Sequence, residues 1–168
     1  IVGSGIRIRR IFVDPPDSEP YPEVLNAIHE ADLVCVGPGS VYTSVIPNLL
    51  IPGIAEAIRD SKAVKAYVCN VMTQPGESDA FTAAEHVVAI QANVPTRVCD
   101  YVVINTGVPS PLTVDKYRES DQFVVDPDID RIRAMGMKVV AGNFMNESDY
   151  VRHDPFKLAG RLLKLIDR

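Results

Sequence analysis

The 168-residue sequence lacks the long apolar runs and the basic clusters that mark membrane and nucleic-acid-binding proteins. No apolar run approaches the roughly 20 residues that cross a bilayer, and no signal-peptide pattern opens the chain. Lysine and arginine are scattered and the formal net charge is −5, whereas phosphate contacts need clustered positive charge. We therefore expect a cytoplasmic protein with neither a membrane nor a nucleic acid as partner.

Signatures of catalysis and of metal binding are absent from the sequence as well. It contains no HExxH, no GxSxG, no His and Cys cluster with metal-ligand spacing, and neither the GxGxxG nor the GxxxxGK[ST] nucleotide motif. The cysteines Cys35, Cys69 and Cys99 lack CxxC spacing, and we expect them to be small buried hydrophobic side chains. The residues thus predict no catalytic set, no metal site and no required cofactor.

Apolar residues make up 46% and charged residues 23% of the chain, which is typical of a folded globular protein. We expect a single domain over residues 1–168. From residue 30 onward, short β-branched runs alternate with helical segments, which predicts βα units around a mainly parallel sheet. The expected strands are residues 33–36, 66–69, 101–104, 123–125 and 138–141, and an alternating strand over residues 6–13 precedes them.

Several expected helices begin at a clear start signal. Ser110, Asp126 and Asp154 each precede a proline, which pairs an N-cap residue with proline at the first helical position. A further helix is expected over residues 80–92, with Phe81, Ala84, Val88 and, less regularly, Val87 on its buried side. These helices would cover the two faces of the sheet.

The run GPGSVYT follows the first expected strand directly and is the first candidate binding site. Gly37 and Gly39 allow positive φ and a close approach to the backbone, while Ser40, Tyr42 and Thr43 offer hydroxyl groups where the next helix begins. Ligands of open parallel sheets bind outside the carboxyl ends of the strands, which is where this run lies. The residues fit a phosphate-binding turn and, equally well, a capped strand-to-helix turn without a ligand.

Polar residues follow two later strands and the end of the chain. Asn70 and Asn105 carry amides that suit the edge of a base or a sugar hydroxyl, but either can instead satisfy loop backbone groups. In the run NVMTQPGESD, residues 74–77 are expected to form a turn and Ser78 or Asp79 to cap a helix, and the run would act as a lid beside a ligand. Arg152 suits a bidentate grip on phosphate, while we expect His153 to be solvated and Asp154 to cap a helix.

Four blocks of sequence, in this order, resemble the YvcK/CofD-like family on the side of the YvcK-type gluconeogenesis factors. They are ADLVCVGPGSVYTSVIPNLLIPGI, VCNVMTQPGESDAFTAAEHV, DYVVINTG and VRHD. The resemblance implies a Rossmann-like, three-layer α/β fold. It also implies a cytoplasmic regulatory protein that binds a UDP-sugar such as UDP-N-acetylglucosamine and is linked to carbon metabolism, cell shape and cell-wall synthesis.

The same resemblance implies roles for particular residues. By position, Tyr117 and Arg152 would hold the UDP-sugar, and the GPGS loop, Asn70 and Asn105 would line the same cleft. The alternative within the family is a CofD-like 2-phospholactate transferase of coenzyme F420 biosynthesis, which uses a divalent metal. Family members normally begin with a GGGTG-like turn and a segment rich in Asp and Gly, and neither is present. We therefore expect a C-terminal portion of such a protein, without the N-terminal part of the fold, and leave open whether it forms a homo-oligomer.

Overall fold

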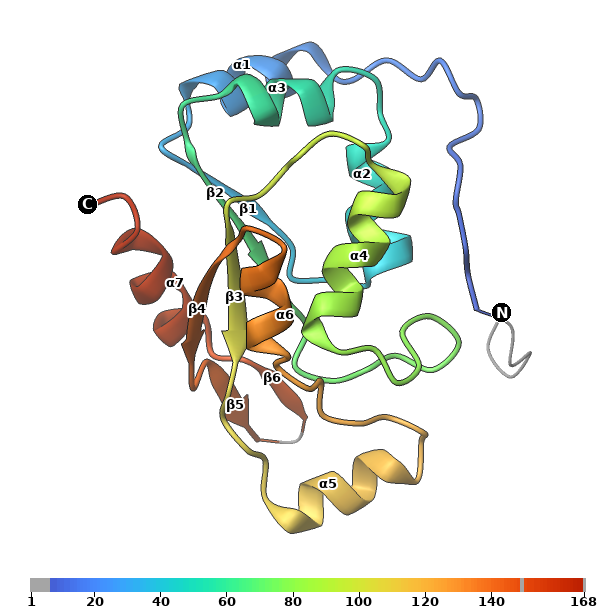
Figure 1. Cartoon of the computed structure of the whole chain (residues 1–168), viewed down its shortest axis with the longest axis vertical. Helices are drawn as coiled ribbons and strands as arrows, with labels where there is room; N and C mark the ends of the chain where they lie inside the picture. Colours follow the sequence, from blue (N-terminus) through green and yellow to red (C-terminus); the bar gives the residue numbers. More distant parts are fainter. Residues whose placement is uncertain (1–6, 149, 168) are drawn as a thin grey trace.

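The computed structural model describes residues 7–148 and 150–167, and its centre is a four-stranded parallel sheet (Figure 1). The strands lie side by side in the order in which they occur in the sequence, and helices connect them. They are β1 (Leu33–Val36), β2 (Val64–Val68), β3 (Tyr101–Asn105) and β4 (Lys138–Gly142). The predicted α/β fold with a mainly parallel sheet is confirmed.

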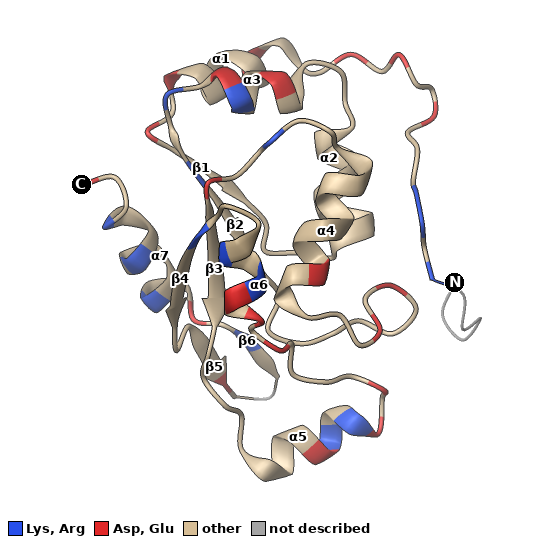
Figure 2. Ribbon diagram, in the orientation of Figure 1, with Lys and Arg blue, Asp and Glu red and all other residues tan. Residues whose placement is uncertain are grey.

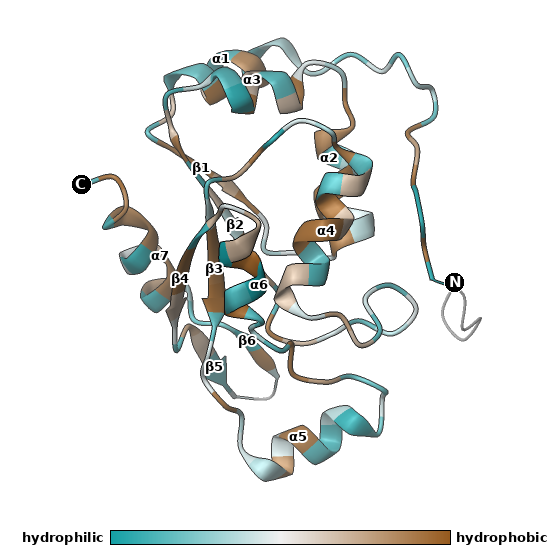
Figure 3. Cartoon of the chain, in the orientation of Figure 1, coloured by the Kyte–Doolittle hydropathy of each residue, from teal (hydrophilic) through white to brown (hydrophobic). Residues whose placement is uncertain are grey.

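The strands are mainly apolar, with Lys65 in β2 and Lys138 at the start of β4 as exceptions, because both faces of the sheet are covered (Figure 3). Alternate residues belong to two cores. Tyr67 and Val102 lie in the larger core, together with residues of α2, α4 and α6, whereas Val68 and Val103 lie in a smaller core that α7 closes. Helices, sheet and helix thus form the three layers expected of a Rossmann-like fold.

The helices differ in how they attach to this sheet. α1 and α3 contact each other near one end of the molecule, and α5 extends beyond the opposite end (Figure 1). A short π-helix, η1, runs directly into α2. The bounds are α1 (Pro22–Glu30), η1 (Val41–Val45), α2 (Ile46–Leu49), α3 (Ile54–Asp60), α4 (Ala83–Asn93), α5 (Pro111–Arg118), α6 (Ile129–Ala134) and α7 (Pro155–Leu163).

Two of the three predicted helix starts are confirmed. The Ser110 side chain caps α5, and the Asp154 side chain accepts hydrogen bonds from two backbone N–H groups at the start of α7. The third prediction is wrong, because α6 begins after Asp128, which has φ +41°. The Asp126 carboxylate instead accepts a hydrogen bond from the Asp128 backbone N–H, at 2.9 Å, and stabilises the turn before the helix.

Helix α4 starts three residues later than expected, at a capping box formed by Thr82 and Glu85. The buried stripe of the helix consequently includes Val87, which is 1% exposed, and leaves Val88 41% exposed. The prediction that Val88 faces the core is therefore wrong. His86, which the sequence suggests is a surface residue, is fully buried on the same stripe.

The expected strand over residues 123–125 does not join the sheet. It makes a single antiparallel bridge, from Val124 to Met72 in the loop after β2. A separate antiparallel hairpin, for which the sequence has no clear signal, is formed by β5 (Met145–Glu147) and β6 (Val151–His153). Strands of three residues are too short to show a hydrophobic period.

The expected strand over residues 6–13 is also not formed. Ile6 lies outside the described residues, and the rest of the segment, residues 7–13, forms no strand pairing. Its apolar pattern is nevertheless used, because Ile8 and Ile11 pack against the larger core. The Ile11 backbone N–H donates a 3.0 Å hydrogen bond to the Asn93 side chain at the end of α4, which holds the segment there.

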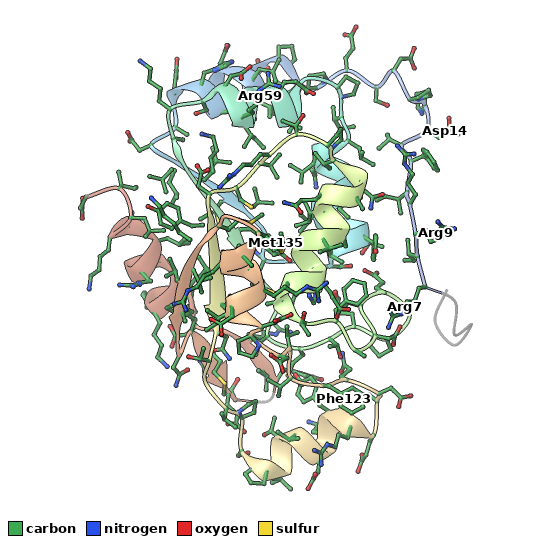
Figure 4. All side chains as sticks on the ribbon, in the orientation of Figure 1. Arg7, Arg9, Asp14, Arg59, Phe123 and Met135 are labelled. Carbon is green, nitrogen blue, oxygen red and sulfur yellow. The ribbon has the colours of Figure 1, made fainter. Side chains whose placement is uncertain are left out.

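Charged side chains of both signs are interspersed over the molecule (Figure 2). Arg7, Arg9 and Asp14 are exposed along the N-terminal segment, on the far side of the molecule from α7 (Figures 1 and 4). Within the described residues, no single helix is both long enough and apolar enough to span a bilayer.

The cysteines are only partly as predicted. Cys69 and Cys99 are buried, and burial raises the pKa of their thiols to about 12 and about 11. Cys35 is exposed, so the prediction that it is buried is wrong. Cys35 lies on β1, at one edge of the sheet, and its register partner Ala66 belongs to the smaller core. Helix α7, which covers that core, lies beside β4 at the other edge of the sheet (Figure 1). Cys35 is therefore on the covered face of the sheet but at the edge opposite the helix that covers it.

Candidate functional site

A pocket of about 720 Å³ lies at the carboxyl ends of β1 and β2. Four segments line it: residues 38–40 after β1, residues 70–74 after β2, Tyr117 with Gln122 from α5 and the turn after it, and residues 150–153. This volume falls within the roughly 300–1,000 Å³ typical of small-molecule sites. Its place is also the one where open parallel sheets bind ligands.

The pocket brings together most of the residues that the sequence singled out. The predicted site residues that line it come from the Gly-rich turn, the end of β2, α5 and β6: Gly39, Ser40, Asn70, Tyr117 and Arg152. Segments separated by more than 100 residues thus meet in one cavity. The remaining predicted residues, Gly37, Tyr42, Thr43 and Asn105, do not line it.

Gly37 and Tyr42 have structural contacts. Gly37 has φ +81°, and a Cβ atom there would lie 3.0 Å from the Val68 carbonyl oxygen, so the turn requires glycine. Tyr42 is 5% exposed, and its hydroxyl donates a 3.1 Å hydrogen bond to the Ile8 carbonyl oxygen. Both residues support the turn from behind rather than face the pocket.

Asn105 is 6% exposed and its amide is engaged by the backbone. Its Oδ1 accepts hydrogen bonds from the N–H groups of Gly107, at 3.2 Å, and of Phe144, at 3.0 Å. Its Nδ2 donates to the Gly107 carbonyl oxygen at 2.9 Å. The prediction that Asn105 lines the cleft is therefore wrong, because the amide holds the turn after β3 against the chain that follows β4.

Asn70 occupies the equivalent position after β2 but faces the pocket. Its Oδ1 accepts a 3.2 Å hydrogen bond from the Gly39 backbone N–H, and its Nδ2 donates to the Gln74 side chain at 3.3 Å. The Gly-rich turn is therefore tied to the next loop through one half-buried amide.

A carboxylate from that same loop lies against the Gly-rich turn. The hydroxyl groups of Ser40 and Thr43 both donate to Glu77, with 3.1 Å from Thr43 Oγ1 to Oε1, and they lie 2.7 Å from each other. The hydroxyls that the sequence offered for a phosphate are thus bonded to an anion of the protein itself. Of the run expected to act as a lid, residues 70–79, residues 70–74 line the pocket.

The residues that the resemblance assigns to the UDP-sugar are held next to each other. The Val151 backbone N–H donates a 2.8 Å hydrogen bond to the Tyr117 hydroxyl oxygen, which fixes α5 beside β6. Arg152 follows Val151, and its guanidinium carbon lies 5.6 Å from the centroid of the Tyr150 ring. The pocket therefore combines a cation with two aromatic rings on one wall.

A second contact anchors the start of α5 to the same hairpin. Glu147 of β5 accepts hydrogen bonds from the Ser110 backbone N–H, at 3.0 and 3.1 Å, and from the hydroxyl groups of Ser110 and Thr113. These hydrogen bonds lower the pKa of the Glu147 carboxyl. Both ends of α5 are thus attached to the β5–β6 hairpin.

His153 lines the pocket, so the prediction that it is solvated is wrong. Its ring is half-buried, and Nε2 has no hydrogen-bond partner among the described residues. Burial lowers the pKa of its imidazole, with a smaller opposing effect of the Cys69 backbone, and thus favours the neutral form of the ring. A neutral imidazole in a pocket can accept or donate a hydrogen bond to a ligand.

Other lining residues were missed for want of a local signal. Gln74 lies in the predicted lid, but no sequence signal assigns it a binding role. Gln122 and Tyr150 lie in irregular segments without a recognisable motif. Within the described part of the chain, no group of three or more His, Cys, Asp or Glu side chains is arranged to hold a metal ion.

Comparison with known proteins gives a consistent set of relatives. The family model described as 2-phospho-L-lactate transferase CofD matches residues 2–145. The gluconeogenesis factor of Bacillus subtilis (strain 168) is 41% identical over 164 residues, which are 96% of this chain and 51% of that protein. The gluconeogenesis factor of Halalkalibacterium halodurans is 40% identical over 162 residues, 96% of this chain and 50% of that protein.

The fold is found in a crystal structure of a UPF0052 family member from Bacillus halodurans. The TM-score is 0.92 at 40% sequence identity, and the match covers 95% of this chain and 52% of that one. The chain therefore spans about half the length of the relatives that it matches.

Proposed function

The chain belongs to the YvcK/CofD-like family, and from this membership we propose that it is part of a UDP-sugar-binding regulatory protein of the gluconeogenesis factor type. The ligand that we propose is UDP-N-acetylglucosamine, bound by a protein of the cytoplasm. The proposed roles are in carbon metabolism, cell shape and cell-wall synthesis, with ligand binding rather than catalysis as the activity of the pocket.

The observation that carries this proposal is the pocket itself. Arg152, whose guanidinium fork suits a diphosphate, lines it together with Ser40 of the Gly-rich turn. Tyr117 and Tyr150 offer aromatic surface for a base, and the amide of Asn70 offers both a donor and an acceptor for sugar hydroxyls. A nucleotide-sugar presents each of these chemistries, and a cavity of about 720 Å³ is large enough to admit one.

Calorimetry of the full-length protein with UDP-N-acetylglucosamine tests this proposal. Arg152→Glu should raise the Kd at least about tenfold, because a charge-assisted hydrogen bond is replaced by repulsion between a carboxylate and phosphate. Arg59→Glu is the matched control, since Arg59 is an exposed residue of α3, far from the β5–β6 hairpin (Figure 4). The absence of a binding heat for the wild type at millimolar ligand would count against the proposal.

The description of the matching family model favours a second candidate, a CofD-like 2-phospholactate transferase. The full-length protein would be incubated with a nucleotide-activated phospholactate, an acceptor flavin and magnesium. Transfer of the phospholactyl group to the flavin would establish this activity in place of the regulatory one. We expect no product, together with binding of UDP-N-acetylglucosamine under the same conditions.

A further inference from the structure

Three polar groups form a hydrogen-bond relay along the pocket wall, and its direction is fixed by chemistry. The Gly39 backbone N–H can only donate, so the Asn70 atom 3.2 Å away is the acceptor Oδ1. The other end of that amide, Nδ2, can only donate, so the Gln74 atom 3.3 Å away is the acceptor Oε1. The relay therefore ends with the amide nitrogen Nε2 of Gln74.

The backbone of Gln74 is held rigidly, which presets where this amide points. Its N–H donates a 2.9 Å hydrogen bond to the hydroxyl of Ser78, a fully buried residue. Its carbonyl oxygen accepts hydrogen bonds from the N–H groups of Glu77, at 3.1 Å, and Ser78, at 2.9 Å. A side chain on a fixed backbone, with its carbonyl end already bonded, loses little entropy when a ligand binds.

The Nε2 atom of Gln74 has no hydrogen-bond partner in the parts of the chain that the structure describes, and the residue lines the pocket. We propose that Gln74 is a specificity-determining residue that donates a hydrogen bond to an oxygen acceptor of the bound nucleotide-sugar, an inference that rests on the proposed function. The acceptor is a carbonyl of the base, the carbonyl of the N-acetyl group, or a phosphate oxygen. A ligand with a donor at that point would place two N–H groups against each other.

Two substitutions of Gln74 separate this role from a purely structural one. Gln74→Ala removes both the donor and the link to Asn70, and should raise the Kd for UDP-N-acetylglucosamine by about 3- to 10-fold. Gln74→Glu keeps an oxygen that accepts from Asn70 but presents a second, charged oxygen to the ligand. It should raise the Kd at least about tenfold more than Gln74→Ala does, because an acceptor then faces an acceptor.

The matched control for the added charge is Gln122→Glu, which places the same carboxylate in the pocket lining outside the relay. We expect it to weaken binding less than Gln74→Glu. Equal losses for the two variants would overturn the inference, since charge alone would explain them. A Gln74→Glu variant that binds like the wild type while Gln74→Ala binds weakly would also overturn it, because only the link to Asn70 would then matter.

All measurements are made by calorimetry on the full-length protein, with folding checked by circular dichroism. If Gln74→Glu fails to fold, Gln74→Met provides the test. It has a similar length but no donor, and should match the Gln74→Ala loss, whereas unchanged affinity would contradict the inference. A wild type that binds no nucleotide-sugar refutes the proposed function, whereas normal wild-type binding without the Gln74 pattern refutes the inference alone.

Three ligands identify the oxygen that Gln74 contacts: UDP-N-acetylglucosamine, UDP-glucose and UDP. If the acceptor belongs to the N-acetyl group, the Gln74 variants should weaken only the first ligand. If it belongs to the base or the phosphates, all three ligands should weaken by the same factor. A loss with none of the three, while the wild type binds them, would overturn the inference.

Discussion

Replacing Asn105 with alanine should destabilise the fold, although the residue ends strand β3, at the edge of the sheet where ligand-binding residues are expected. The substitution removes hydrogen bonds of 2.9 to 3.2 Å to the N–H and carbonyl groups of Gly107 and to the N–H of Phe144. Asn105 is 6% exposed, so water cannot readily replace these bonds. Each buried backbone group left without a partner costs about 1–3 kcal/mol.

Two of the three hydrogen bonds go to the same residue, Gly107, and local relaxation of the turn should recover some of the lost stability. We therefore expect Asn105→Ala to lower the free energy of unfolding by about 2–4 kcal/mol. Asn70→Ala is the matched control, because Asn70 has the same side chain at the end of the neighbouring strand. It is half-buried and makes two hydrogen bonds at the pocket, so its removal should cost about 1 kcal/mol of stability and weaken ligand binding.

Urea unfolding followed by far-UV circular dichroism measures both variants, since the chain contains no tryptophan to report by fluorescence. The midpoint should shift for Asn105→Ala with an unchanged slope. A loss below about 1 kcal/mol, or one no larger than that of Asn70→Ala, would refute the assignment of Asn105 to the backbone of the turn.

Two further predictions concern glycine and histidine. Gly37→Ala should destabilise the fold by about 2–3 kcal/mol in thermal unfolding, because Gly37 has φ +81° and a Cβ atom would crowd the Val68 carbonyl oxygen. The control is Gly136→Ala, which has φ +78° but no atom near the added Cβ, and should cost about 1 kcal/mol. Equal losses of stability for the two variants would show that crowding is not the cause. Burial lowers the pKa of His86 in the folded state, so the unfolded chain binds the proton first and the free energy of unfolding should fall as the pH drops below about 6.5, by at most about 1.4 kcal/mol per pH unit. His86→Leu should flatten this slope in urea titrations at several pH values, whereas a flattening by His29→Leu, at an exposed position, would contradict the explanation.

The central sheet was predictable from sequence because most residues of its strands are apolar, on both faces. Residues 33–36 and 101–104 stand out as β-branched runs and form β1 and most of β3. Residues 123–125 show the same local pattern, but pair only with the loop after β2. Composition indicates that a run is extended, whereas its partner depends on contacts between distant residues.

The candidate site was predictable where a residue directly follows a strand and its partners are close by. Gly39 and Asn70 follow β1 and β2 and do line the pocket. The same reasoning fails for Asn105, because one of its partners is Phe144, 39 residues further along the chain. His153 was missed because it lies in a three-residue strand whose burial arises from packing and not from a pattern.

Helix α5 contains no buried residue, and outside the hairpin it packs through Tyr117 against a small cluster that includes Val71 and Met72. The hydrogen bonds that attach its two ends, to Glu147 and Val151, both go to the β5–β6 hairpin. In terms of hydrogen exchange, α5 and the hairpin should therefore open as one cooperative unit at a lower free energy than the sheet. That unit carries Tyr117 and Arg152, whereas Asn70 and the Gly-rich turn follow the sheet strands β2 and β1, which should exchange more slowly. The pocket thus has one rigid wall and one wall of low local stability, so a ligand that bridges them should slow amide exchange in α5 most.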